Sequence, residues 1–190
     1  MKSRLAVFTL ALFCAWAGNA FALSKEELKV QNDRISADYK IGRDKCASLS
    51  SNPKDICQAE AKGAEKVAKA ELEAQHKPTP RNAQKALEAK ANAAYSVAKE
   101  KCDDLAGNPK DVCMKEAKAV QTSAMADAPG TKVREVGTQK SAADVNDARK
   151  DATEDKRDAN YKVAREKCDS LAGDAKDGCV NAAKAQYGMK

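Results

Sequence analysis

Apolar residues recur in this chain at the three- and four-residue steps of an amphipathic helix. The clearest run lies in the middle of the chain, at Leu87, Ala91, Ala94, Ala98, Cys102 and Leu105. After a short break the run resumes at Cys113, Ala117, Val120 and Ala124. The break is Gly107-Asn108-Pro109. Glycine takes the left-handed conformation that ends a helix, asparagine is a favoured N-cap and proline suits the first helical position. The pattern therefore predicts a helix, a tight turn and a second helix.

A 19-residue phrase around this turn occurs three times, over residues 39–57, 95–113 and 161–179. Each copy has a tyrosine seven residues before a cysteine, a leucine three after it, Lys-Asp eight and nine after it, and a second cysteine eleven after it. Steps of seven and three are helical, so the tyrosine, cysteine and leucine are predicted to share one face. The tyrosine rings are expected to cover the open end of each helix seam rather than to form a binding stripe.

The turns of the other two copies follow the same logic. In the first copy Asn52 is predicted to cap the second helix and Pro53 to begin it. In the third copy Gly173 is predicted to stop the first helix and Asp174 to cap the second. The three copies thus predict three helical hairpins.

The cysteine spacing predicts one disulfide within each hairpin. With the apex of the turn between Gly107 and Asn108, the two flanking cysteines stand at equal height on the inner face of an antiparallel hairpin. Alanine-rich helices approach closely enough for the Cα separation of about 4.4–6.8 Å that a disulfide requires. We therefore predict an all-α, elongated fold of three disulfide-stapled antiparallel helical hairpins, with the pairs Cys46–Cys57, Cys102–Cys113 and Cys168–Cys179.

The hairpins are expected at residues 23–77, 78–126 and 141–190, with a linker at 127–140. Ser24 and Glu27 have the spacing of a capping box, and Thr79-Pro80 begins a new helix after a proline-containing break. The linker holds Pro-Gly and a second glycine without a helical period. The stretch 146–160 is almost entirely charged. It is interpreted as a solvated helix with weak tertiary contacts, and disorder is the alternative.

Large apolar residues are sparse after residue 22, and every Phe and Trp lies before it. A chain with so little apolar volume cannot build one large core and needs cross-links instead. We therefore expect three hairpins that are largely independent of one another. The third is expected to be the weakest, because its turn lacks the proline and Gly178 replaces the Ile56 or Val112 of the other two.

Residues 1–22 have the parts of a secretory signal peptide. Lys2 and Arg4 form a basic start, residues 5–17 are an apolar run, and small residues stand at Ala20 and Ala22 before the expected cleavage site. The run is shorter than the roughly 20 residues of a membrane span. Six cysteines follow it, an even number that suits disulfides in an exported chain. The sequence therefore predicts an exported protein with no integral membrane segment after cleavage.

The mixed charge of the chain disfavours nucleic acid as a partner. The chain carries 34 Lys and Arg against 28 Asp and Glu, a net charge of +6. Acids and bases alternate along it, whereas nucleic-acid binding favours a one-sided basic face. The apolar helix faces are alanine rather than Leu, Phe or Trp, which limits binding to a membrane surface. We expect a monomer or weak oligomer, and the sequence leaves open a protein partner of unknown identity.

Candidate catalytic and metal-binding residues are few. The C-x10-C spacing fits neither the close cysteine pairs of zinc sites nor the C-x-x-C of thiol-exchange catalysts. His76 is the one histidine and is expected at the surface. Asp103 and Asp104 are adjacent on a helix and face different ways, so they do not form an acid–base pair. The methionines after residue 22 are scattered, at Met114, Met125 and Met189. We assign no catalytic, cofactor or metal residue, and the chain is predicted not to be an enzyme.

The phrases YSVAKEKCDDLAGNPKDVCMKEAKA and YKVAREKCDSLAGDAKDGCVNAAKA resemble those of exported Lys/Ala-rich proteins of Gram-negative bacteria. These are mostly uncharacterised C-x10-C repeat proteins, sometimes described as TolA-like. The resemblance implies a cell-envelope location and no particular activity. The function expected is a non-enzymatic periplasmic structural or envelope-stress role. The alternative is a binding module that presents helix faces to a periplasmic protein partner or a metal.

Overall fold

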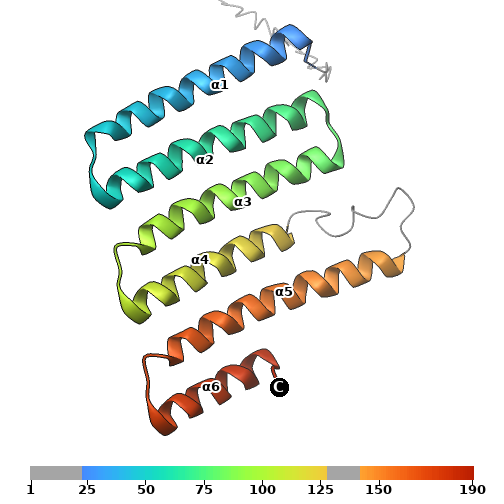
Figure 1. The fold of residues 1–190 in the computed structure, drawn as a ribbon. Coiled ribbons are helices and arrows are strands. Elements are labelled where there is room, and N and C mark those ends of the chain that lie inside the picture. Colours follow the sequence, from blue (N-terminus) through green and yellow to red (C-terminus); the bar gives the residue numbers. More distant parts are fainter. Residues whose placement is uncertain (1–22, 128–141) are drawn as a thin grey trace, which may run out of the picture.

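A computed structural model describes residues 23–127 and 142–190, and in these residues the helices lie side by side in one layer (Figure 1). The helices are α1 (Lys25–Lys45), α2 (Ser51–His76), α3 (Pro80–Cys102), α4 (Gly107–Asp127), α5 (Ala142–Cys168) and α6 (Gly173–Tyr187). A short 3-10 helix, η1 (Cys46–Ser48), follows α1. Each helix runs antiparallel to the next (Figure 1). The predicted all-α fold of stapled hairpins is confirmed, whereas the predicted signal peptide and residues 128–140 of the predicted linker lie outside the described residues.

Two helix starts follow from local side-chain chemistry, as predicted. At α1 the Ser24 Oγ accepts a hydrogen bond from the Glu27 N–H at 3.1 Å, and the Glu27 carboxylate accepts one from the Ser24 N–H at 2.9 Å. At α3 the Thr79 Oγ1 accepts from the Asn82 N–H at 3.2 Å, and Pro80 is the first helical residue. These bonds satisfy N–H groups that have no partner within a helix.

The α-helical part of each first helix ends at or next to its cysteine, and in the second and third hairpins not at the glycine that the sequence suggested. α3 ends at Cys102 and α5 at Cys168, and α1 gives way to η1 at Cys46. In all three turns the leucine three residues later donates its N–H to the carbonyl of that cysteine, at 3.0–3.1 Å. Because the chain has already left the helix, these leucines do not join the seam. Leu49, Leu105 and Leu171 are 41–43% exposed.

The second helix of each hairpin begins earlier than predicted, at Ser51, Gly107 or Gly173. Gly107 and Gly173 have the expected left-handed φ of 59° and 54°, but they open a helix instead of closing one. Asn52, Asn108 and Asp174 are therefore not the N-caps that the sequence predicted, and the N-cap of α6 is Ala172. Ser51 also has a left-handed φ, 53°, which costs a residue with a side chain about 1–2 kcal/mol.

The core consists of cysteine and alanine. Among the described residues the side chains buried most completely are Cys46, Cys102 and Cys168, at 0–1% exposure. The other buried apolar residues are alanines and one leucine, namely Leu72, Ala86, Ala91, Ala117, Ala119 and Ala183. The Cα atoms of the three disulfide pairs lie 5.6–5.7 Å apart, so the pairing is the one predicted. An alanine methyl buries little area, and the bridges therefore supply much of what holds each hairpin closed.

The hairpins are not independent, contrary to the sequence-based expectation. α2 lies along α3 and α4 along α5, so the layer is continuous across the hairpin boundaries (Figure 1). At the closest approach of α2 and α3, a Cβ atom on Gly63 would stand only 2.9 Å from the Cβ of Ala93. The charged stretch 146–160 is helical as predicted, as part of α5, and its Lys156 pairs with Asp127 of α4. Small residues thus pack between hairpins as they do within them.

Removal of the central bridge tests this continuity. Replacing Cys102 and Cys113 together by Ser should lower the free energy of unfolding by about 2–5 kcal/mol, the usual cost of losing a bridge in a small exported domain. Because α3 packs on α2 and α4 on α5, amide hydrogen exchange should also accelerate in α2 and α5. Faster exchange confined to α3 and α4 would show that the hairpins behave independently.

Two helical glycines give a matched test of the close contact between α2 and α3. Gly63→Ala gains about 1 kcal/mol of helix propensity, but the new methyl overlaps Ala93, and such overpacking costs about 1–3 kcal/mol. We therefore expect a net loss of stability in denaturant unfolding. Gly178→Ala lies in a helix with nothing within 4 Å of the new Cβ, so it should stabilise by about 1 kcal/mol. Equal gains at both sites would contradict the close packing of α2 on α3.

Candidate binding site: two grooves between the hairpins

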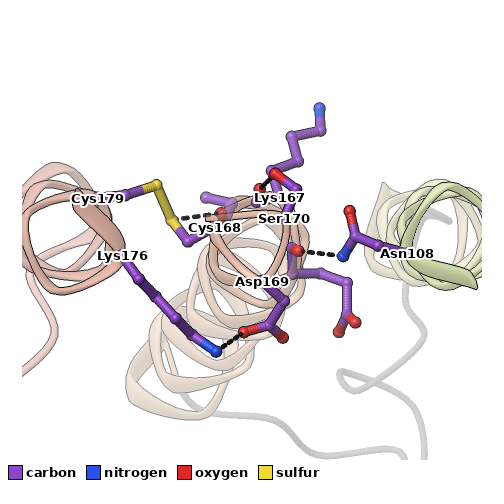
Figure 2. A network of polar contacts seen from close by, with 9 residues as sticks. Asn108, Lys167, Cys168, Asp169, Ser170, Lys176 and Cys179 are labelled. Atoms are coloured by element: carbon purple, nitrogen blue, oxygen red, sulfur yellow. Dashed lines mark hydrogen bonds and ion pairs between the residues drawn. A yellow bond between two sulfur atoms is a disulfide. The ribbon is translucent and has the colours of Figure 1, made fainter. Parts of the chain in front are cut away.

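The cysteines have the surroundings of structural bridges. Cys168, the last residue of α5, is joined to Cys179 of α6 (Figure 2), and its side chain is 0% exposed. Thiol–disulfide exchange requires a thiolate to reach one of the two sulfurs. Burial of the first cysteine in each hairpin therefore favours a structural role for all six residues.

The other candidates from the sequence serve the fold. The Nδ1 of His76 lies 3.0 Å from the carbonyl oxygen of Leu23 and joins the end of α2 to the start of α1. Asp103 pairs with Lys110 across its turn, at 2.8 Å, and is not brought together with Asp104 as a catalytic pair. Within residues 23–127 and 142–190, no group of three or more His, Cys, Asp or Glu side chains is arranged to hold a metal ion.

Two of the three repeated tyrosines, Tyr95 and Tyr161, reach across their own hairpins. The Lys118 ammonium of α4 lies 5.3 Å from the ring centroid of Tyr95 in α3, a cation–π distance. Tyr161 of α5 meets Tyr187 of α6 edge to face, with ring centroids 6.4 Å apart. These contacts agree with the expectation that the rings cover the helix seams.

Two grooves lie on the layer where one hairpin meets the next. The first groove runs between α2 and α3 and has an almost entirely apolar lining with two charged residues at one end. It comprises Glu60, Gly63, Ala64, Val67, Ala93, Ala94, Val97, Ala98 and Lys101. The second groove runs over α4 and α5 to α6 and is lined by Glu116, Ala119, Val120, Ser123, Ala124, Asn160, Val163, Ala164, Lys167, Gln186 and Tyr187.

The two grooves are built from equivalent positions of the repeat. When residues are counted from the first cysteine of their unit, Glu60, Ala64 and Val67 correspond to Glu116, Val120 and Ser123. Likewise Ala94, Val97, Ala98 and Lys101 correspond to Asn160, Val163, Ala164 and Lys167. Sequence reasoning missed these surfaces because it compared only the residues between tyrosine and second cysteine. The groove residues become visible when the repeats are also aligned over the helix before and the helix after this phrase.

The lining of the grooves suits the binding of a peptide segment with apolar side chains. Val120 is 66% exposed in the second groove, and a glutamate and a lysine stand at one end of each groove. In the second groove these two, Glu116 and Lys167, form an ion pair of 2.7 Å. Neither groove is lined by a histidine or cysteine among the described residues. An apolar floor with a charged end can hold a helix or an extended segment that has apolar side chains on one face.

A partly buried amide links the two hairpins at the second junction. The Asn108 Nδ2 donates a hydrogen bond to the main-chain oxygen of Glu166 in the next hairpin, at 2.9 Å (Figure 2). Lys115 of α4 also reaches the Glu166 carboxylate, at 3.9 Å. At the equivalent position of the first junction, the Nδ2 of Asn52 is buried without a hydrogen-bond partner. The asparagine amide is therefore hydrogen-bonded at the second junction and lacks a partner at the first.

Ion pairs close two of the three turns. Lys110 pairs with Asp103 and Lys176 with Asp169, each at 2.8 Å (Figure 2 shows the second). The hydrogen bond from the lysine lowers the pKa of each aspartate, and the aspartate hydrogen bond raises the pKa of Lys110. In the first turn Lys54 stands at the equivalent position, but the aspartate is replaced by Ala47. The Lys-Asp dipeptides thus contribute through their lysine and not through helix capping.

Comparison with known proteins adds no relative. No protein-family model, curated protein or solved structure matches the chain. The resemblance to exported C-x10-C proteins therefore stays a prediction. In the part of the chain that the structure describes, no helix is long and apolar enough to cross a membrane.

The turn pairs predict a pH dependence with a definite sign. The folded pKa of Asp103 and of Asp169 is lower than in the unfolded chain, so each pair stabilises the fold above the unfolded pKa and loses this contribution as the pH falls through the folded pKa. Lys110→Gln should raise the pKa of Asp103 in an NMR titration and leave that of Asp169 unchanged. In Ala47→Asp the new carboxylate should pair with Lys54, and its pKa should be lowered as those of Asp103 and Asp169 are. If the pKa of Asp103 does not change in Lys110→Gln, the ion pair between Asp103 and Lys110 is contradicted.

Proposed function

We propose that this chain is a non-enzymatic binding module of the periplasm, which presents its inter-hairpin grooves to a segment of a protein partner. The observation that carries the proposal is the recurrence of one groove at equivalent positions of two junctions. A surface that recurs along stacked helical hairpins is the usual binding device of such arrays.

The charge and exposure of the grooves support a protein partner. The Val120 side chain is 66% exposed in the second groove. Exposed apolar surface is unfavourable in water, and a bound apolar segment would cover it. The Glu60/Lys101 and Glu116/Lys167 ends offer one acid and one base each. A mixed pair of this kind suits a peptide with both charges better than a polyanion such as nucleic acid.

The bridges and the export features support the proposed compartment. Disulfides of this kind persist in oxidising compartments, and the first 22 residues have the pattern of a secretory signal peptide. A Gram-negative periplasm, as the resemblance implies, satisfies both requirements.

A structural or envelope-stress role is the second candidate, and a different observation favours it. The core is largely alanine held by three bridges, so the chain has the covalent reinforcement of a protein built to survive unfolding conditions. Such a role requires no partner in the grooves.

The two candidates differ in what a groove substitution does. Ala64 and Val120 are exposed and stand at equivalent positions of the two grooves. The double variant Ala64→Glu/Val120→Glu should have nearly the same melting temperature as the unmodified chain. It should reduce the capture of partner protein from oxidised periplasmic extract at least about tenfold, because a bound charge without a partner costs more than 1.4 kcal/mol. Capture is measured by mass spectrometry on immobilised protein lacking residues 1–22.

Leu105→Glu provides the matched control. Leu105 is exposed and apolar but lies in a turn outside both grooves, so its replacement should not change capture. The binding proposal fails when the double groove variant and Leu105→Glu capture the same proteins in the same amounts. No capture above background by the unmodified chain favours the structural role.

A further inference from the structure

The two hairpin junctions share an ion pair at equivalent positions. A lysine twelve residues before the first cysteine of its unit pairs with an acid of the preceding hairpin, as Lys90 does with Glu71 at 2.6 Å and Lys156 with Asp127. Small residues meet between them, as Gly63 and Ala93 do. Near the turn of the second junction, Glu166 pairs with Lys115 and Lys167 with Glu116. These contacts define the face with which a first helix packs on the hairpin before it.

We call this face the stacking face and define it by its positions in each first helix. In α3 it comprises Ala86, Lys90, Ala93, Val97, Glu100 and Lys101. In α5 it comprises Ala152, Lys156, Ala159, Val163, Glu166 and Lys167. Its members share a pattern of apolar or small residues, one cation in the middle of the helix and an acid followed by a cation at the end.

α1 carries a complete stacking face, and among residues 23–127 and 142–190 no second hairpin packs on it. The equivalent positions are Val30, Arg34, Ala37, Ile41, Asp44 and Lys45, which reproduce both the apolar pattern and the three charges. Val30 is 64% and Ile41 55% exposed, whereas Ala86, which corresponds to Val30, is 8% exposed. The face that is partly covered on α3 and α5 is therefore more open on α1, and it carries larger apolar residues there.

α6 does not supply the complement that α1 lacks. The complementary face of α4 consists of Asn108, Lys115, Glu116, Ala119 and Asp127, and the equivalents in α6 begin with Asp174, Asn181 and Ala182. Asp174 cannot donate the hydrogen bond that Asn108 makes, and Asn181 and Ala182 lack the two charges. α6 also ends at Tyr187 with a left-handed Gly188, short of the level of Asp127. One end of the array is thus open and the other is closed against growth.

We propose that the outer face of α1 is a docking surface for a helix of another protein that carries the complementary pattern. That pattern, read from α4, is Lys-Glu-x-x-small-x7-acid: the Lys-Glu pair meets Asp44 and Lys45, the small residue meets Ala37, and the acid meets Arg34. The register of the two internal junctions identifies the occupant, because the structure already shows which helix covers such a face. This surface is separate from the grooves, and its test does not depend on them.

The test converts α6 into a complement and asks whether α1 recognises it. The chain of residues 23–190 receives Asp174→Asn, Asn181→Lys and Ala182→Glu, all at exposed positions. The three substitutions restore one hydrogen bond and two ion pairs, so self-association in sedimentation velocity should be at least about tenfold stronger than in the unmodified chain. Addition of Ile41→Asp should abolish the gain, and Val30→Asp should do the same. Leu105→Asp, at an exposed leucine outside the stacking face, should leave the gain intact.

Three results would overturn the proposal. The first is a triple variant that associates no more strongly than the unmodified chain, since α1 then fails to recognise the complement. The second is an unmodified chain that already associates through a contact abolished by Ile41→Asp, since the occupant is then a second copy. The third is loss of association in Leu105→Asp as well, which assigns the gain to another surface.

Discussion

The structure depends on one constraint, the disulfide that joins the end of one helix to the second turn of the next. Cys102 is the last residue of α3 and Cys113 is the seventh of α4, and the other two hairpins repeat this arrangement. A seam of alanine methyl groups buries too little area to hold two long helices together. A bridge that closes a loop of about this length supplies roughly 3 kcal/mol by restricting the unfolded chain. The buried sulfur takes the place that a large apolar side chain holds in other helical proteins.

The same small side chains that make the bridges necessary allow the hairpins to merge into one layer. Alanine and glycine let neighbouring helices approach closely along their length, as Gly63 and Ala93 do. Ion pairs at fixed positions, such as Lys90 with Glu71 and Lys156 with Asp127, then select the register. Exposed pairs contribute little stability individually, so we assign them to alignment. An alignment that repeats from junction to junction also repeats the surface above it, which gives equivalent grooves.

The two ends of the helical layer present different faces, because each first helix carries one side of the junction contacts and each second helix carries the other. Each first helix carries the face that packs on another hairpin, and on α1 this face is not covered by any other described helix. α2 and α4 offer the complement, with Ala59 of α2 at the position of Lys115, whereas in α6 Asp174, Asn181 and Ala182 replace the matching residues of α4. Stacked helical arrays need at least one end that resists further growth. α6 meets this requirement, and α1 does not.

The sequence by itself determined the helical hairpins, the pairing of the six cysteines and the starts of α1 and α3, because these depend on residues within one turn or one repeat of each other. The cysteine pairing was predicted correctly although the turn was misplaced: an eleven-residue spacing tolerates a helix end that lies at Cys102 instead of Gly107. Only the tertiary structure decided that the hairpins pack together, that Asn108 reaches Glu166, and that Leu105 lies outside the seam. A stripe of alanine, lysine and glutamate has the pattern of a solvated face. Its burial depends on a second helix that brings small residues and opposite charges within reach, and residues 29 or 58 positions apart meet only after that helix has docked.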